Sequence, residues 1–185
     1  MSDLPGDSPV GPPRGAPAPP TDLDLGERSS IVAYLNHQRL GLLEICRDLS
    51  HDEMARRAVP PSDISLLAMI RHLAGVEHHW FRRVLGERLD LPYRWIDDPS
   101  RGFATVATGP AALAEAWQDW QDEVSHAELL IADLPDDALA IDLLSDGDTT
   151  VSVRDLLVHV IEEYARHLGH ADLIRERLLA VRPVR

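Results

Sequence analysis

The stretch that decides the fold is Val153-Arg-Asp-Leu-Leu-Val-His-Val-Ile-Glu-Glu-Tyr-Ala-Arg-His-Leu-Gly-His-Ala-Asp-Leu-Ile174, near the end of the chain. In a helix, with about 100° between successive residues, its apolar side chains share one face. The middle of that face carries His159, Glu163, His167 and His170. Such groups are costly to bury unless they are paired or bind a metal. The pattern predicts an amphipathic helix with candidate metal ligands in its buried stripe.

The first 26 of the 185 residues differ in composition from the rest, because they contain half of the 14 prolines and few large apolar side chains. We interpret residues 1–26 as a disordered leader. Residues 27–182 are enough for one domain with a full-sized core. The sequence therefore predicts a single folded domain behind a Pro-rich segment.

Charge and cysteine content exclude several classes of function. The net charge of −13 disfavours a nucleic-acid partner. No apolar run approaches the roughly 18 residues that span a bilayer, and the start lacks the features of a secretory signal. We therefore expect a cytoplasmic protein without a membrane partner. Cys46 is the only cysteine, which excludes a disulfide framework, and its apolar helical setting argues against a cysteine nucleophile.

Apolar residues repeat at three- and four-residue steps in four parts of the chain. These segments are 27–49, 63–86, 110–134 and 153–181. Ser62 or Asp63 is the expected N-cap of the second helix, and Ser152 with Asp155 forms the cap of the fourth. Residues 145–150 form a turn cluster, which is typical of a short hairpin. We predict an all-α four-helix bundle, and the pattern leaves the up-down order of its helices open.

Glu163 and His167 are four residues apart, so their side chains stack on one helical face and can hold the same ion. A further ligand has to come from a facing helix, where His72, His79 and Glu77 are the candidates. Two histidines and one carboxylate leave coordination positions open, as in catalytic sites. Zinc is our first expectation for this mononuclear site, with nickel, iron and manganese as alternatives.

His159 and His170 flank this pair, one helical turn on either side. Each is a candidate ligand, a hydrogen-bond partner that orients a ligand, or a proton carrier. Glu77 has two interpretations: a group next to the metal, or a structural acid paired with an arginine such as Arg166. We favour the structural pairing. We interpret His78 and His79, beside Trp80, as interfacial or surface residues.

Two long phrases of the sequence are Ser65-Leu-Leu-Ala-Met-Ile-Arg-His-Leu-Ala-Gly-Val-Glu-His-His-Trp-Phe81 and Glu162-Glu-Tyr-Ala-Arg-His-Leu-Gly-His-Ala-Asp-Leu-Ile-Arg-Glu176. They resemble the DinB/YfiT-like superfamily, and the resemblance spans roughly residues 27–180. It implies a four-helix bundle, often a homodimer, that holds one divalent metal through a histidine of the second helix and two ligands of the fourth. Here these are His72, Glu163 and His167, a set similar to that of mycothiol-dependent maleylpyruvate isomerase. Periodicity alone places His72 only at the margin of its apolar stripe.

The resemblance also implies a function, since characterised members of the superfamily are isomerases and S-transferases that use mycothiol or bacillithiol. We therefore expect a metal-dependent enzyme that presents a thiol such as mycothiol to an electrophilic small molecule. His170 or His159 would carry the proton, and Arg166, Arg71 or Arg175 would bind a carboxylate on the substrate or the thiol. The alternative is a non-catalytic bundle that binds a metal, a small ligand or a regulatory partner.

Overall fold

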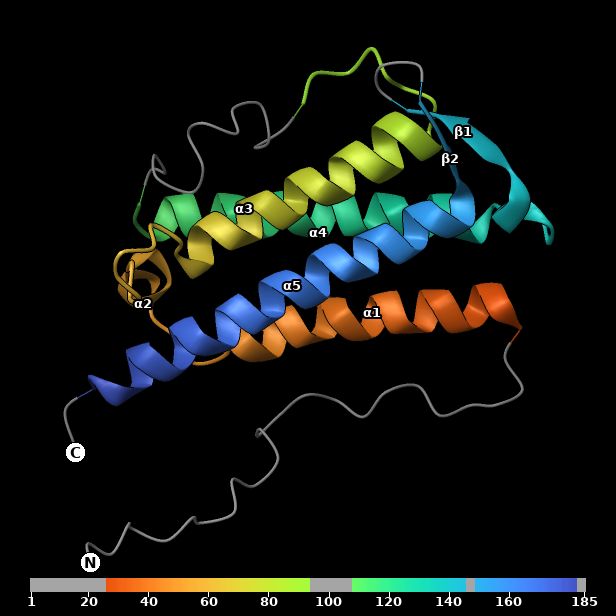
Figure 1. The fold of residues 1–185 in the computed structure, drawn as a ribbon. Helices are drawn as coiled ribbons and strands as arrows, with labels where there is room; N and C mark the ends of the chain where they lie inside the picture. The colour runs from red at the N-terminus through yellow and green to blue at the C-terminus, as the bar shows by residue number, and fades with distance from the viewer. Residues whose placement is uncertain (1–25, 94–107, 146–148, 183–185) are drawn as a thin grey trace, which may run out of the picture.

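The computed structural model describes residues 26–93, 108–145 and 149–182, and the predicted leader lies outside them except for Gly26. Within these ranges the chain is mostly helical, and two short strands form one small sheet (Figure 1). No helix among the described residues combines the length and the apolar content that a membrane span requires. The predicted all-α class is confirmed.

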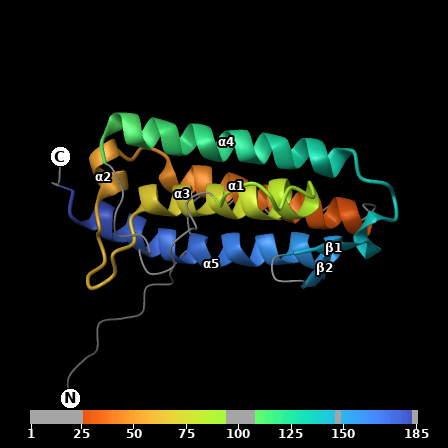
Figure 2. The same cartoon turned by 90° about the horizontal axis from the view of Figure 1, so that it is seen from above.

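Four long helices form the bundle: α1 (Glu27–Cys46), α3 (Leu66–Glu77), α4 (Pro110–Ala132) and α5 (Val153–Ala180). Helix α1 packs on α5 and α3 packs on α4, while α3 also faces α5. Figures 1 and 2 show that α1 and α5 run in one direction and that α3 and α4 run in the other. The bundle therefore consists of two parallel pairs, an order that the sequence pattern left open.

The start of α3 differs from the predicted one. Ser65 is its N-cap, because the Oγ of Ser65 accepts a hydrogen bond from the backbone N–H of Ala68. Ser62, one of the two predicted caps, accepts a bond from the backbone N–H of Ile64 instead. The expected cap at Ser62 or Asp63 is therefore wrong, since these residues belong to the turn before the helix.

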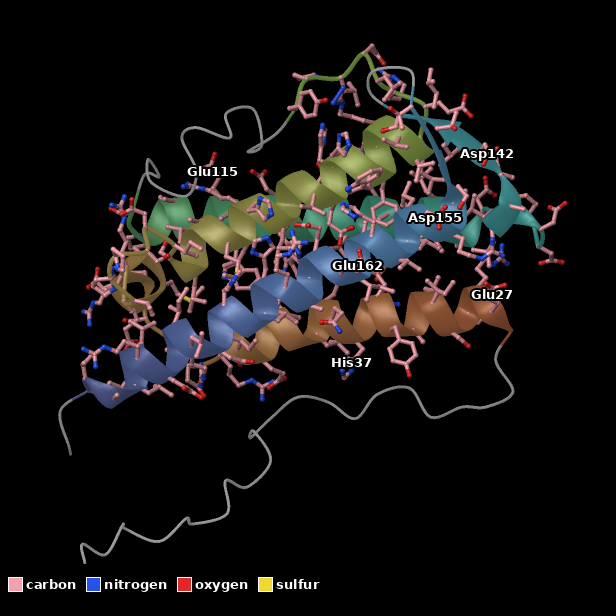
Figure 3. The ribbon with its side chains drawn as sticks, in the orientation of Figure 1. Glu27, His37, Glu115, Asp142, Asp155 and Glu162 are labelled. Atoms are coloured by element: carbon pink, nitrogen blue, oxygen red, sulfur yellow. The ribbon has the colours of Figure 1, made fainter. Side chains whose placement is uncertain are left out.

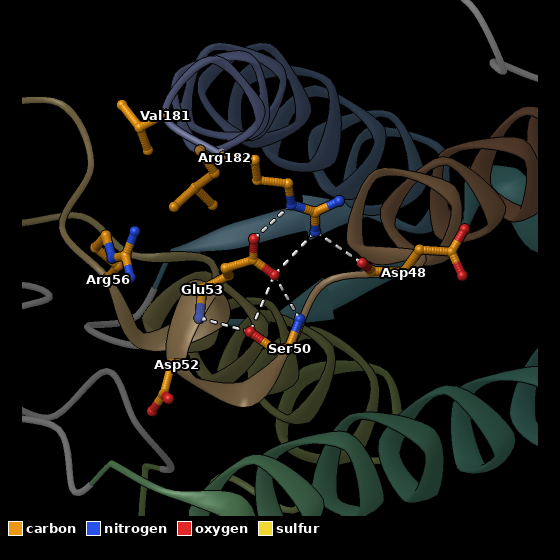
Figure 4. A pocket seen from close by; sticks show the side chains of 8 residues that line it. Asp48, Ser50, Asp52, Glu53, Arg56, Val181 and Arg182 are labelled. Atoms are coloured by element: carbon orange, nitrogen blue, oxygen red, sulfur yellow. Dashed lines mark hydrogen bonds and ion pairs between the residues drawn. The ribbon is translucent and has the colours of Figure 1, made fainter. Parts of the chain in front are cut away.

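The first helix, α1, ends three residues before its predicted end, and a short helix that was not predicted, α2 (His51–Ala55), follows it. A capping box starts α2: the Oγ of Ser50 accepts from the N–H of Glu53, and the Glu53 carboxylate accepts from the N–H of Ser50. Arg182, just beyond α5, donates to Oε1 of Glu53 at 2.6 Å and to the carbonyl of Asp48 at 2.9 Å (Figure 4). These bonds tie the end of α5 to the connection between α1 and α2.

A short hairpin leads directly into α5. Strands β1 (Asp142–Leu144) and β2 (Thr150–Ser152) pair in antiparallel fashion. The Oγ of Ser152 accepts from the backbone N–H of Asp155 and donates to its carboxylate at 2.8 Å. Both the predicted hairpin and the predicted cap of the last helix are confirmed. The cap fixes the residue at which α5 begins.

Helix α3 continues as a π-helix, η1 (His78–Leu85). Two hydrogen bonds that span five residues mark its end, from the N–H of Gly86 to the carbonyl of Phe81 and from the N–H of Arg88 to the carbonyl of Arg83, both at 2.8 Å. Together α3 and η1 extend to the predicted end of the second helix. Wide turns of this kind occur frequently at functional sites.

A buried polar network joins all four long helices. Glu77 is fully buried in α3, and Arg39 of α1 donates to both of its carboxylate oxygens, at 2.9 and 2.7 Å. Tyr164 of α5 donates to Oε1 of Glu77 at 2.7 Å and accepts from Nε1 of Trp120 on α4 at 2.7 Å. Burial and the neighbouring carboxylate raise the pKa of Tyr164 well above its usual value. Glu77 is therefore a structural acid, as we favoured, but its partner is Arg39 and not Arg166.

Candidate metal centre

His72 of α3 meets Glu163 and His167 of α5 where these two helices face each other. Nε2 of His72 lies 3.6 Å from Oε2 of Glu163, and Nε2 of His167 lies 3.4 Å from the same oxygen. The centroids of the two imidazole rings are 4.4 Å apart. One ligand atom from each residue lies within 4.8 Å of the other two. The structure thus brings together the three residues that the resemblance implies as metal ligands.

The three residues lie at the border of the core. His167 is buried, whereas the side chains of His72 and Glu163 are 25% and 13% exposed. On either side of them the stripe of α5 is apolar and buried, through Leu156, Val160, Ala171 and Ile174. The polar middle of the stripe therefore faces the margin of α3, at the border between core and solvent.

The protonation state of the two histidines suits the binding of a cation. Nη1 of Arg166 lies 2.7 Å from Oε1 of Glu163, so that Oε2 is the oxygen nearest to both imidazoles. Burial lowers the pKa of His72, and burial together with the neighbouring imidazole of His72 lowers the pKa of His167 to about 4. Both rings are therefore neutral at neutral pH, which is the form in which a histidine nitrogen binds a metal.

The donor set fits a divalent metal. Two neutral imidazoles and a carboxylate are typical ligands of zinc and related ions in sites that keep a position open. Ligands about 2.1 Å from a tetrahedral ion lie about 3.4 Å from one another, close to the 3.4 and 3.6 Å found between the imidazole nitrogens and Glu163. Within the described residues, these three form the one cluster of three or more His, Cys, Asp and Glu side chains with metal-binding spacing.

His170 and His159 lie outside this cluster but next to it. The ring of His170 is exposed and its centroid is 5.7 Å from that of His167. The half-buried ring of His159 packs against Trp80 of η1, with 4.9 Å between centroids. Their positions agree with a role beside the three ligands rather than among them.

Among the three arginines considered for carboxylate binding, Arg166 alone contacts the cluster. Arg71 is buried, and its guanidinium lies 3.8 Å from the carboxylate of Glu115 on α4, which Figure 3 labels. Arg175 donates to two backbone carbonyls at the end of α1, at 2.6 and 2.7 Å. The guanidinium of Arg175 therefore caps α1, and the structure does not bring Arg71 or Arg175 to the centre.

Two features of the site were missed by sequence reasoning. Arg166 lies three residues after Glu163, a spacing typical of helical ion pairs, but we considered it as a partner of Glu77 or of a carboxylate on the substrate or thiol, and not of Glu163. His78 is buried rather than at the surface, and its Nδ1 lies 3.3 Å from Oε1 of Glu123 on α4. No signal in the sequence indicates the contact between His78 and Glu123, because the π-helix changes the angular spacing of the side chains after α3.

An open hollow of about 850 Å³ lies at a different place, beside α2 at the end of the bundle (Figure 4). Asp48, Ser50, Glu53 and Arg182 are among the residues that line it. Glu53 and Arg182 already pair with each other, and none of the three candidate ligands contributes to its walls. The chemistry of the side chains, rather than the size of a hollow, therefore places the candidate site between α3 and α5.

A helical bundle with this His/Glu/His cluster between its second and its last long helix defines a protein of the DinB-like class, whose members typically bind a divalent metal. The chain belongs to the mycothiol-S-transferase family, whose protein-family model matches residues 30–180. The resemblance to the DinB/YfiT-like superfamily is thereby confirmed. Comparisons with curated proteins and with solved structures found no match.

Proposed function

We propose that this protein binds a divalent metal through His72, Glu163 and His167 and uses mycothiol, or a similar thiol, to attack an electrophilic small molecule as an S-transferase or isomerase. The observation that carries the proposal is the convergence of these three side chains in a chain of the mycothiol-S-transferase family. Zinc is the first expectation because imidazole and carboxylate ligands suit it. Nickel, iron and manganese are the alternatives.

The thiol has to come from outside the chain. Cys46 is the only cysteine and is 8% exposed, and burial raises the pKa of its thiol to about 12. Almost none of such a thiol is ionised at neutral pH, so it is a poor nucleophile. This supports a separate thiol as cosubstrate.

The reaction needs an activated sulfur and a place for its proton. A divalent ion in this site would supply a Lewis acid that lowers the pKa of a nearby thiol. In S-transfer, the sulfur forms a bond to an electrophilic carbon, the bond from that carbon to its leaving group breaks, and the leaving group keeps the bonding electrons. In isomerisation, the sulfur adds to a double bond and later departs, so that the thiol is regenerated.

Residues beside the cluster would handle the proton and orient the reactants. His170 is the first candidate for the proton carrier, because its exposed imidazole lies next to that of His167. His159 is the second. The side chain of Arg166 is 60% exposed while it holds Glu163, so it fixes this carboxylate and also offers a cation to a carboxylate on the substrate or the thiol.

Metal analysis of protein purified without a chelator tests the first half of the proposal. We expect about one divalent ion per chain, and its loss in His167→Ala, because one of the three ligands is then missing. His37→Ala is the matched control and should keep the metal, since His37 lies on the side of α1 turned away from α5 (Figure 3). Absence of a metal from the unchanged protein would sink the proposal.

Thiol-dependent turnover tests the second half. With mycothiol and an electrophile such as 1-chloro-2,4-dinitrobenzene, we expect consumption of both reactants by the metal-loaded protein and its loss in His167→Ala. Metal-loaded protein that accelerates no reaction of mycothiol would instead favour the alternative of a non-catalytic metal- or ligand-binding bundle.

A further inference from the structure

We propose that Trp80, His79, Tyr93 and His159 form a subsite for the flat, conjugated part of the electrophilic substrate, beside the metal centre. The role in catalysis rests on the proposed function, whereas the binding of a flat ring does not.

The four rings make one continuous row. The centroids of His159 and Trp80 are 4.9 Å apart, those of Trp80 and His79 are 4.7 Å apart, and those of His79 and Tyr93 are 5.5 Å apart with nearly parallel planes, at 14°. Three of the rings are half-buried and Tyr93 is 37% exposed. A row of aromatic and imidazole rings that remains within reach of solvent is a surface on which another ring can stack.

The row begins one helical turn from the centre. His159 precedes Glu163 by four residues on α5, a rise of about 6 Å, and His79 follows His72 by seven residues along α3 and η1. Because α3 and α5 are antiparallel (Figure 1), both steps lead toward the same end of the bundle. A carbon that reacts at the centre can therefore carry a flat group that extends along the row.

The chain around Tyr93 is held in place by several contacts. Nε2 of His78 lies 3.0 Å from the carbonyl oxygen of Pro92, and Nδ1 of the same ring lies 3.3 Å from a carboxylate oxygen of Glu123. The guanidinium of Arg83 lies over the ring of Tyr93, 3.8 Å from its centroid. These contacts fix the position of the Tyr93 ring beside η1 while 37% of the residue remains exposed, as a surface for binding a ligand requires.

The chemistry of the row selects the kind of substrate. Indole and phenol rings stack well on flat, electron-poor π systems and gain little from a short alkyl group. The imidazoles add hydrogen-bond donors or acceptors at the edge of the surface. We therefore infer preference for an unsaturated or aromatic electrophile over a small aliphatic one.

The test compares two electrophiles with mycothiol as the thiol, flat 1-chloro-2,4-dinitrobenzene and aliphatic iodoacetamide. In Trp80→Leu, which keeps an apolar side chain against the core, the ratio of the two kcat/KM values should shift about tenfold against the flat electrophile, mainly through its KM. Trp80→Phe keeps a ring and should restore most of the ratio. Trp117→Leu, which changes a half-buried tryptophan of α4, is the matched control and should leave the ratio as it is.

Equilibrium binding of 1,3-dinitrobenzene, a flat ring without a leaving group, separates this inference from the proposed function. Trp80→Leu should weaken this binding about tenfold in the full chain, with no thiol present. Should binding depend on Trp80 while no thiol reaction is found, the subsite stands and the proposed function fails. An unchanged electrophile ratio together with unchanged dinitrobenzene binding overturns the subsite.

A Trp80→Leu variant that raises the KM of mycothiol instead of that of the flat electrophile overturns the inference too, because the rings would then bind the thiol. Should Trp80→Leu fail to fold, as judged by circular dichroism, Tyr93→Leu carries the same test, since that ring is exposed and lies outside the helices. The expected direction is the same, with a smaller shift because Tyr93 is further along the row.

Discussion

Glu77→Gln is expected to be among the most destabilising single substitutions in this protein. The side chains of Arg39 and Glu77 are 4% and 0% exposed and are joined by two hydrogen bonds, and Tyr164 donates a third bond to the same carboxylate. The glutamine has nearly the same shape but no charge, so the buried guanidinium of Arg39 would keep only the exposed carboxylate of Glu128, 4.0 Å away, as an anion nearby. Breaking a buried pair in this way costs about 3–5 kcal/mol, a large share of the roughly 5–15 kcal/mol that stabilises a typical domain.

Two comparisons isolate the cause. Arg154→Gln removes an exposed pair with Glu27, whose side chains are 42% and 59% exposed, and should cost little stability because water screens such pairs. The double variant Arg39→Met, Glu77→Leu removes both charges. It should therefore be less destabilised than Glu77→Gln alone, because no unpaired charge remains in the core.

Urea unfolding at pH 7, followed by tryptophan fluorescence, measures the free energy of unfolding from the midpoint and the slope. A loss below about 1 kcal/mol for Glu77→Gln, at an unchanged slope, would refute the reasoning. It would mean that water or another group compensates Arg39 in the absence of the carboxylate.

Three further predictions concern the metal, the thiol and pH. A chelator should lower the Tm of the purified protein by several degrees, since an ion that binds only the folded state stabilises it. The chelator should have no effect on the Tm of His167→Ala. An equal Tm of the unchanged protein with and without chelator would tell against a tightly bound metal. Cys46 should react with a disulfide reagent only after unfolding, because it is buried and its pKa is about 12; fast reaction in the folded state would contradict this. Arg182 and the backbone of Ser50 lower the pKa of Glu53 from 4.5 to about 2. The contribution of Glu53 to stability is therefore present above pH 4.5 and is lost as the pH falls toward 2. The difference in unfolding free energy from Glu53→Gln should accordingly shrink between pH 6 and pH 3, and a constant difference would show that the ion pair contributes nothing.

The long helices were predictable because their apolar residues repeat strongly and their caps are local. The Ser152 and Asp155 cap is an example, since both partners lie within four residues of each other. The direction in which each helix runs was not predictable from the sequence, because the same apolar stripe can face the core in either direction. The apolar repeat of α1 likewise gave no sign that Arg39 is buried. Burial of an arginine depends on a partner 38 residues away.

The candidate site was predictable only in part from spacing. Glu163 and His167 follow from the helical repeat alone, because both lie in the stripe of one helix. His72 did not, since it lies at the margin of its stripe, and the resemblance to a known superfamily selected it. The structure explains why His72 lies at the edge of its apolar stripe. A metal ligand that a small molecule can reach has to lie at the border of the core, and the His72 side chain is 25% exposed.

Two adjacent residues of α5 have separate roles, one in stabilising the core and one in the candidate metal centre. Tyr164 turns into the core, where it joins Glu77, while Glu163 turns toward His72 at the border. Successive residues differ by about 100° on a helix, so the buried bond of Tyr164 also sets the direction of Glu163. Removing the ligand should then leave the scaffold intact. In metal-free protein, Glu163→Gln should cost much less stability than Glu77→Gln, yet it should abolish metal retention. Equal losses of stability in the two variants would show that the centre is part of the structural core and not a separate site built on it.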